Sequence, residues 1–297
     1  MMTADFSAWA AERQAAFEEV LRRVLPQPEV SPQRLHQAMR YAVLEGGKRV
    51  RPLLAFAAGE LTGADIARVD IVAASVELIH AYSLVHDDMP CMDDDVLRRG
   101  KPTCHVQYDE ATALLVGDSL QTLAFQLLTE HRLSDGPQQQ MAMIRLLASA
   151  SGSRGMAGGQ AIDLDSVGKS LTLPELENMH IHKTGALIRA AVLLGAQCGA
   201  VSPVQLACLD HYAKCVGLAF QVVDDVLDAE ADTATLGKTA GKDADNDKPT
   251  YVTLLGVTAA REMANNLHRE ALESLAEFGD AAQRLRELAD FIVLRKF

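Results

Sequence analysis

The chain has 297 residues, of which 48% are hydrophobic, and its formal net charge at pH 7 is −12. This length and hydrophobic content are sufficient for a large buried core, and we expect one domain over 1–297. The acidic balance argues against nucleic acid as a partner.

The sequence predicts an all-α fold, arranged as a single large helical bundle. Alanine and leucine are abundant, and no stretch alternates between polar and apolar residues as a half-buried strand would. We expect helices near 3–24, 33–45, 51–60, 66–88, 108–131, 138–152, 174–198, 203–228, 258–278 and 280–295.

Membrane insertion and secretion are not expected. The first predicted helix, 3–24, is amphipathic and lacks the layout of a signal peptide. The most apolar stretch, 186–201, contains Arg189 and is too short to cross a bilayer. The five cysteines show no C-x-x-C spacing, which is typical of a protein in a reducing cytoplasm.

An acidic stretch follows the predicted helix 66–88. Asp87 to Asp95 contains five carboxylates in nine residues, and Arg98 and Arg99 come soon after. Such crowding of like charge predicts a divalent cation with oxygen ligands, and the arginine pair predicts a phosphate nearby. A solvated acidic turn is the plainer alternative, but the preceding helix is too apolar to lie on the surface.

The helix should end close to Asp87, because Pro90 removes a backbone donor and disfavours helix at the residue before it. Two residues six apart on an intact helix point about 120° away from each other. We therefore expect Asp93 to fold back from a loop, so that it converges with Asp87 on one metal site.

A second acidic cluster lies on the predicted helix 203–228. Asp224 and Asp228 are four residues apart, so they share one face at about 40° from each other, and Gln221 joins that face. Two such clusters, each ending an apolar helix, predict facing helices that hold ions at one end of the bundle.

Two segments are interpreted as breaks or loops. Residues 152–159 are rich in glycine, and we favour close helix packing or a break there over a phosphate loop, because the spacing is not that of a P-loop. Residues 232–247 are polar, include Lys238 and are long enough to act as a lid over a site.

Together these motifs resemble those of the bacterial short-chain trans-prenyl diphosphate synthases, and most of all the members that make farnesyl diphosphate. The matching segments follow the family's order over nearly the whole chain: 46–52 (GGKRVRP), 87–93 (DDMPCMD) with 98–100 (RRG), 158–160 (GGQ) with Asp163, 182–185 (HKTG), 220–221 (FQ) with 224–228 (DDVLD), and 237–238 (GK). The resemblance implies the isoprenoid synthase type of helical bundle, with the active-site cavity between core helices, and a homodimer.

The resemblance also implies the chemistry. Isopentenyl diphosphate would condense head to tail with dimethylallyl or geranyl diphosphate through an allylic cation, with Mg²⁺ at the leaving diphosphate. The implied metal ligands are Asp87, Asp88, Asp93 and Asp224. For Asp225 and Asp228 two roles stay open: binding a metal ion, or orienting the neighbouring basic groups or metal-bound water.

The family pattern assigns the remaining site residues to three groups. The allylic diphosphate would be bound by Arg98, Lys183, Lys238 and Lys248. Isopentenyl diphosphate would be bound by Lys48, Arg51, His80 and Arg99. The cation would be stabilised by Thr184, Gln221 and the carbonyl of Lys183.

Tyr82 and Ser83 are the candidate chain-length residues. Tyr82 lies five residues before Asp87, about 7.5 Å deeper along the helix axis, where a ring can form a floor under the growing chain. Ser83 is too small to block it. The alternative is that Tyr82 faces another helix as ordinary core with its hydroxyl satisfied.

Four rival functions share parts of the pattern. A terpene cyclase would lack the segment 46–52. A helical metal phosphohydrolase built around His86 and Asp87 would need further ligands at helical spacing. A non-catalytic subunit of a heteromeric synthase should have lost its Asp motifs. A geranylgeranyl diphosphate synthase, with the same chemistry and a longer product, is the closest alternative.

Overall fold

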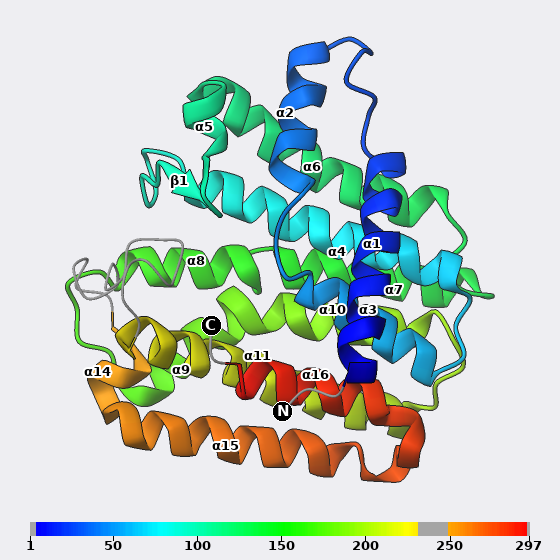
Figure 1. Ribbon diagram of the computed structural model, residues 1–297, viewed down its shortest axis with the longest axis vertical. Coiled ribbons are helices and arrows are strands. Elements are labelled where there is room, and N and C mark those ends of the chain that lie inside the picture. Colours follow the sequence, from blue (N-terminus) through cyan, green and yellow to red (C-terminus); the bar gives the residue numbers. More distant parts are fainter. Residues whose placement is uncertain (1–3, 231–248, 296–297) are drawn as a thin grey trace.

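The computed structural model describes residues 4–230 and 249–295, and these form a bundle of helices with one short hairpin (Figure 1). The elements are α1 (Ala4–Val24), α2 (Gln33–Val43), α3 (Val50–Leu61), α4 (Ile66–Asp87), β1 (Leu97–Arg98), β2 (Lys101–Pro102), α5 (Cys104–Gln107), α6 (Glu110–Glu130), α7 (Pro137–Ser151), α8 (Met156–Asp165), α9 (Leu173–His180), the π-helical turn η1 (Ile181–Gly185), α10 (Ala186–Gln197), α11 (Pro203–Glu230), α14 (Tyr251–Leu255), α15 (Val257–Ser274), the 3₁₀ helix η2 (Ala276–Ala282) and α16 (Gln283–Val293). The prediction of an all-α bundle is confirmed.

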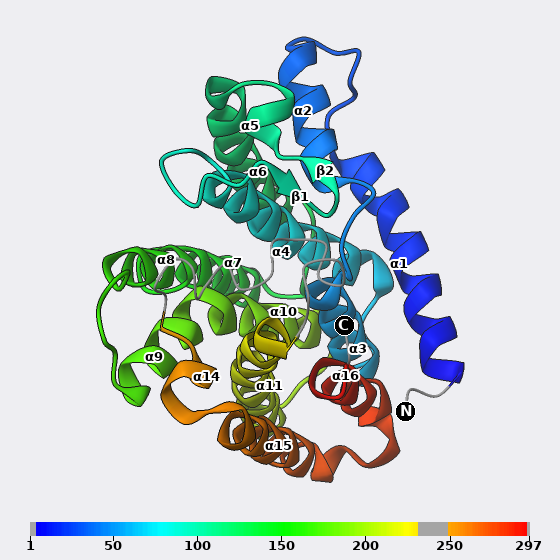
Figure 2. The ribbon, with the colours of Figure 1, turned by 60° about the vertical axis from the view of Figure 1, so that its left-hand side comes forward.

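The bundle buries two apolar clusters. One gathers side chains of α1, α2, α4, α6 and α7, and the other gathers those of α3, α10, α11, α15 and α16. Helix α4 packs against α6 on one side and against α3 and α10 on the other (Figure 2), and α3 and α10 contribute side chains to both clusters. The end of α4 therefore lies where the two halves of the bundle meet.

The predicted helices are present, with boundaries shifted by a few residues, and five of the described elements were not predicted: α5, α8, α14 and the strands β1 and β2. Helix α8 begins inside the glycine-rich segment, for which close helix packing or a break was predicted. Helix α14 spans five residues, and the hairpin strands two each, which is too short for a periodic pattern. The predicted helix 174–198 follows one helical path but contains η1, where the turn widens.

Within the described ranges 4–230 and 249–295, two helices are long and apolar enough to cross a membrane by length and composition. In α4 72% of the apolar window is buried inside the bundle, as in the core helix of a globular protein, but in α6 only 39% is buried. Helix α6 thus presents apolar side chains outward, including Leu114 and Leu115, which are about half exposed.

Candidate active site

The acidic end of α4 has the predicted shape. The helix ends at Asp87, and Asp88 is its C-terminal cap. The following loop folds back, because the backbone N–H of Asp93 donates to the carbonyl of Asp87 at 2.9 Å. This hydrogen bond brings Asp93 beside Asp87, as the loop interpretation required.

Asp88 is engaged differently from its neighbour. The hairpin formed by β1 and β2 places Arg98 against Asp88, and the guanidinium donates to both carboxylate oxygens, at 2.6 to 2.9 Å. Asp88 is buried, so the pair is held in a fixed, bidentate geometry. Asp88 thus positions Arg98, a role that the sequence pattern did not suggest.

His86, next to the acidic pair, has a packing role. Its ring Nε2 lies 3.1 Å from the carbonyl oxygen of Leu114 on α6. A side chain at Gly117 would collide with this ring, because a Cβ there would stand 1.9 Å from Nε2. His86 therefore contributes to the packing of α4 against α6. Because its ring is engaged there, His86 does not serve as a metal ligand of the kind that a phosphohydrolase would need.

The main cavity lies beside these carboxylates and has a volume of about 400 Å³, which is within the range of small-molecule sites. It brings together seven of the residues predicted from the sequence: Arg51, His80, Tyr82, Ser83, Asp87, Lys183 and Thr184. Its other walls come from His86 and Met92 and from residues of α8 such as Met156, Gln160 and Leu164. Its lining thus combines charged and polar side chains with apolar ones.

Tyr82 lies in the wall of this cavity and is 8% exposed. Its ring packs edge-on against His86, with centroids 5.8 Å apart. The phenol also has a hydrogen-bond partner in Gln121 of α6, and burial raises the pKa of Tyr82. The ring is thus part of the cavity wall and is also a hydrogen-bonded core residue.

The pKa of Asp87 is raised to about 6, mainly because burial disfavours the carboxylate. The negative charges of Asp93 and Asp88 raise it further, and the ammonium of Lys183 and the guanidinium of Arg98 oppose the shift. A bound cation would stabilise the ionised form of a carboxylate that is buried and lies beside other carboxylates.

Lys183 is fixed by an ion pair to Asp163 of α8, with Nζ 2.6 Å from Oδ2. Lys183 and Thr184 belong to the π turn η1, which is wider than an α turn. Two glycines make room for it: a Cβ at Gly159 would stand 2.1 Å from the backbone N of Lys183, and one at Gly217 would stand 3.0 Å from the Cα of Gly185. The glycine-rich segment is therefore close helix packing, as predicted.

A hydrogen-bonded chain connects η1 to the second Asp motif. The hydroxyl of Thr184 donates to Gln221 Oε1 at 3.1 Å, and Gln221 Nε2 donates to Asp225 Oδ1 at 2.9 Å. The other oxygen of Asp225 accepts from the backbone N–H of Tyr251 at 2.9 Å. Asp225 is buried and fixes the amide of Gln221, so it acts as a positioning residue.

A second pocket, the basic pocket, adjoins the main cavity. It is lined by residues 45–51, Glu77, His80, Arg99, Phe220 and Arg295. It contains all four residues predicted to bind isopentenyl diphosphate, Lys48, Arg51, His80 and Arg99. Arg51 and His80 line both spaces, so the two meet there.

The segment 46–52 is shaped by Arg99. A Cβ at Gly46 or Gly47 would stand 2.8 or 2.7 Å from the Arg99 guanidinium, so only glycine lets that side chain lie across the loop. The neighbouring Arg49 points into the core, where it pairs with Glu77 at 2.6 Å. Arg49 also reaches the pocket wall, but its guanidinium is engaged by Glu77, so its role is structural.

The positively charged side chains of the basic pocket repel one another. Desolvation lowers the pKa of Arg51 and of Arg99, and neighbouring guanidinium groups lower it further, although Glu77 opposes this. Burial and the same arginines lower the pKa of His80 well below its usual value, so this ring is neutral. A bound anion would relieve the repulsion.

Arg295 and Phe220 were missed by the sequence analysis as pocket residues. The Arg295 guanidinium stacks on the Phe220 ring, 4.3 Å from its centroid, and forms a close ion pair with Asp224. Asp224 thus lies beside the basic pocket, and its charge also raises the pKa of Lys48 against the effect of desolvation. No local pattern near the C-terminus could reveal this, because the pair spans 71 residues of sequence.

Gln160 belongs to the motif segment 158–160, and the resemblance assigned no role to its side chain. Both polar atoms of its amide are buried and lack a hydrogen-bond partner among the described residues, and the side chain lines the main cavity. Buried amides rarely lack hydrogen bonds unless a ligand or a water molecule supplies the partners.

Lys238, Lys248 and the predicted lid 232–247 lie outside the described residues.

Comparisons with known proteins show which family the chain is similar to. Residues 32–288 match the polyprenyl synthetase family. The chain is 52% identical over 264 residues to a farnesyl diphosphate synthase of Escherichia coli, covering 87% of this chain and 88% of that one. It is 43% identical to a geranylgeranyl pyrophosphate synthase of Capsicum annuum, covering 98% of this chain and 79% of that one. A crystal structure of a geranyltransferase of Helicobacter pylori, complexed with magnesium and isoprenyl diphosphate, superposes with a TM-score of 0.84 at 33% identity and covers 99% of this chain and 98% of that one.

Proposed function

The chain belongs to the polyprenyl synthetase family, and we propose that it condenses isopentenyl diphosphate with dimethylallyl or geranyl diphosphate to form farnesyl diphosphate and pyrophosphate. The observation that carries the proposal is the pair of joined spaces. One is lined by Asp87 of the first Asp motif and by apolar side chains, and the other is lined by cationic side chains. They meet at Arg51 and His80, as a reaction between two diphosphates would require.

The donor set suits Mg²⁺. Hard cations prefer carboxylate oxygens and often retain water and substrate phosphates as further ligands. We propose Asp87, Asp93 and Asp224 as the protein ligands. Because both oxygens of Asp88 accept from Arg98, we assign Asp88 to positioning that arginine. When bound, Mg²⁺ would neutralise the charge that develops on the leaving diphosphate.

The chain's own residues then divide the reaction between them. Lys183, held by Asp163, and Arg98, held by Asp88, are oriented to bind the allylic diphosphate. The hydroxyl and amide oxygens of Thr184 and Gln221 would face the allylic cation left when the carbon–oxygen bond breaks. The double bond of isopentenyl diphosphate attacks that cation, and the resulting cation loses a proton to the departing pyrophosphate.

The product is assigned to farnesyl diphosphate. The relatives at about half identity are farnesyl diphosphate synthases, and the geranylgeranyl diphosphate synthases are more distant. The test is incubation of the protein with Mg²⁺, isopentenyl diphosphate and geranyl diphosphate, followed by mass analysis of the product. A 20-carbon product as the main species would overturn the assignment.

If the two diphosphates bind at separate sites, a substitution in one site should raise the KM for one substrate much more than for the other. Arg99→Ala and Lys48→Ala should raise the KM for isopentenyl diphosphate roughly tenfold or more, because a hydrogen bond to a charged group contributes about 1.5–3 kcal/mol. The KM for geranyl diphosphate should change far less. Lys101→Ala, in the same hairpin but exposed, serves as the control. Equal losses for both substrates would argue against two distinct pockets.

We also propose that the protein is a homodimer that associates through α6. The outward apolar side chains of α6 are better explained by a second copy of the chain than by solvent. Leu115→Glu should convert the dimer to a monomer in sedimentation velocity, whereas Val204→Glu, at an exposed valine of α11, should not. A wild-type protein that sediments as a monomer would contradict the proposal.

Residues 1–297 are proposed to act as one domain, since α3 and α10 contribute side chains to both apolar clusters. A cytoplasmic location is proposed on the basis of the cysteines, all five of which are free thiols.

A further inference from the structure

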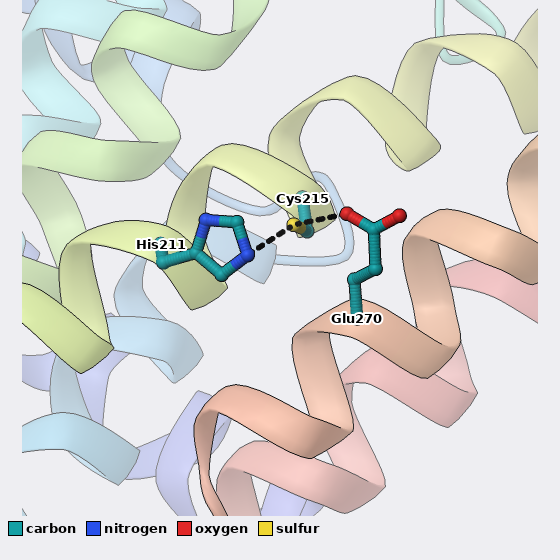
Figure 3. Close-up of side chains that lie close together, drawn as sticks. All are labelled: His211, Cys215 and Glu270. Carbon is teal, nitrogen blue, oxygen red and sulfur yellow. Dashed lines mark hydrogen bonds between the residues drawn. The ribbon is translucent and has the colours of Figure 1, made fainter.

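His211 and Cys215 of α11 and Glu270 of α15 point toward one another on a part of the bundle that the proposed reaction does not use (Figure 3). Cys215 lies nine residues before Asp224 on the same helix, which is about 13.5 Å along the axis. His211 Nε2 is 3.7 Å from Cys215 Sγ, and Glu270 Oε2 is 3.9 Å from it. All three ligand atoms lie within 4.8 Å of one another.

We propose that these three residues bind one zinc-type divalent transition metal ion. Ligands at typical Zn–S and Zn–N distances of about 2.3 and 2.0–2.1 Å, at a tetrahedral angle, lie about 3.6 Å apart. The spacings around the Cys215 sulfur are within a few tenths of an ångström of that value. Little movement of the side chains is needed to enclose an ion.

The chemistry of the set selects the metal. A thiolate and an imidazole favour zinc, cobalt or nickel over Mg²⁺, whose ligands are oxygens. His211 and Glu270 are exposed, so an ion can enter and keep a water as its fourth ligand. The side chains at i and i+4 share a helix face, as in many protein metal sites.

A catalytic thiol is the main alternative use of such a triad, and it fits poorly. A nucleophilic cysteine needs a sulfur that a substrate can reach. Cys215 is only 4% exposed. The sulfur is therefore placed to be a ligand rather than a nucleophile.

An ion at this position would join α11 to α15. Helix α11 carries Gln221, Asp224 and Asp225, so the site would brace the helix that holds the second Asp motif without touching substrate. Prenyl transfer measured with Mg²⁺ alone should therefore be unchanged in His211→Ala.

The test is titration of the purified full-length protein with Co²⁺ in the presence of excess Mg²⁺, which occupies the carboxylate sites. One equivalent of Co²⁺ should produce the near-ultraviolet thiolate-to-cobalt absorption band, and Zn²⁺ should then abolish it. Only a cysteine ligand gives this band. Because the exposed Cys91 lies between Asp88 and Asp93 of the first Asp motif, the titration is repeated with Cys91→Ser, which should keep the band.

Variants locate the site. Cys215→Ser should abolish the band, and the surface changes His211→Ala and Glu270→Gln should weaken Co²⁺ binding about tenfold or more. Cys208→Ser, seven residues earlier on α11, is the matched control and should keep the wild-type band.

A saturating excess of Zn²⁺ should raise the wild-type melting temperature by about 3 °C or more, but not that of His211→Ala. A band that survives Cys215→Ser, or that is indifferent to both surface changes, would overturn the proposal, as would the absence of any band.

Discussion

Asp87→Asn is expected to lower kcat by about a thousandfold with Mg²⁺ saturating, since metal stabilisation of the leaving group amounts to several kcal/mol and ~1.4 kcal/mol corresponds to a factor of ten. Asp224→Asn should act in the same direction. Asp94→Asn is the matched control, because Asp94 lies in the same loop, is exposed and has a left-handed backbone that asparagine tolerates. Full activity of the wild type in excess chelator would contradict the metal-dependent mechanism.

The same substitution should make the metal-free protein more stable. The pKa of Asp87 is about 6 in the fold and 3.8 in its ordinary state, so the folded chain binds more protons between these values. Stability of the metal-free wild type should therefore fall as pH rises from about 4 to 6 through this group, and Mg²⁺ should reverse that loss. Thermal melts of wild type and Asp87→Asn in chelator, at pH 5 and pH 7, measure it. The variant should gain most at pH 7.

Tyr82→Ala is expected to shift the main product from 15 to 20 carbons or longer. The ring lies in the wall of the main cavity below Asp87, and its removal opens space that an additional isoprene unit can fill. The measurement is mass analysis of products made with excess isopentenyl diphosphate. Tyr82→Phe keeps the ring but loses the hydrogen bond to Gln121, and it should still stop at farnesyl diphosphate. If Tyr82→Ala also stopped there, the floor of the tunnel would have to be formed by other residues.

Much of the site was predictable from local rules. Pro90 fixed the end of α4, and the return of Asp93 followed from helix geometry. The grouping of Lys48, Arg51, His80 and Arg99 followed from the resemblance. These predictions depend on residues close in sequence or on a complete motif.

Other features depend on contacts between distant segments. The pairing of Asp88 with Arg98 requires the hairpin, whose strands are too short to leave a pattern. Arg295 reaches Asp224 only because α16 packs against α11. Helix α8 runs through glycines because its backbone lies against Lys183, which composition alone does not reveal.

The π turn at 181–185 gives the helix a phase shift. Each residue of an α-helix advances about 100°, so an added residue within one turn rotates everything beyond it relative to a regular helix. A peptide of residues 173–197 in solution has no Gly159 or Gly217 beside it, and it should relax to a regular helix that directs Lys183 and Thr184 differently. The direction of these two side chains is thus a property of the neighbouring helices. A bulkier residue at Gly217 would not touch substrate. It would still affect the reaction, because it would change the direction in which Lys183 and Thr184 point.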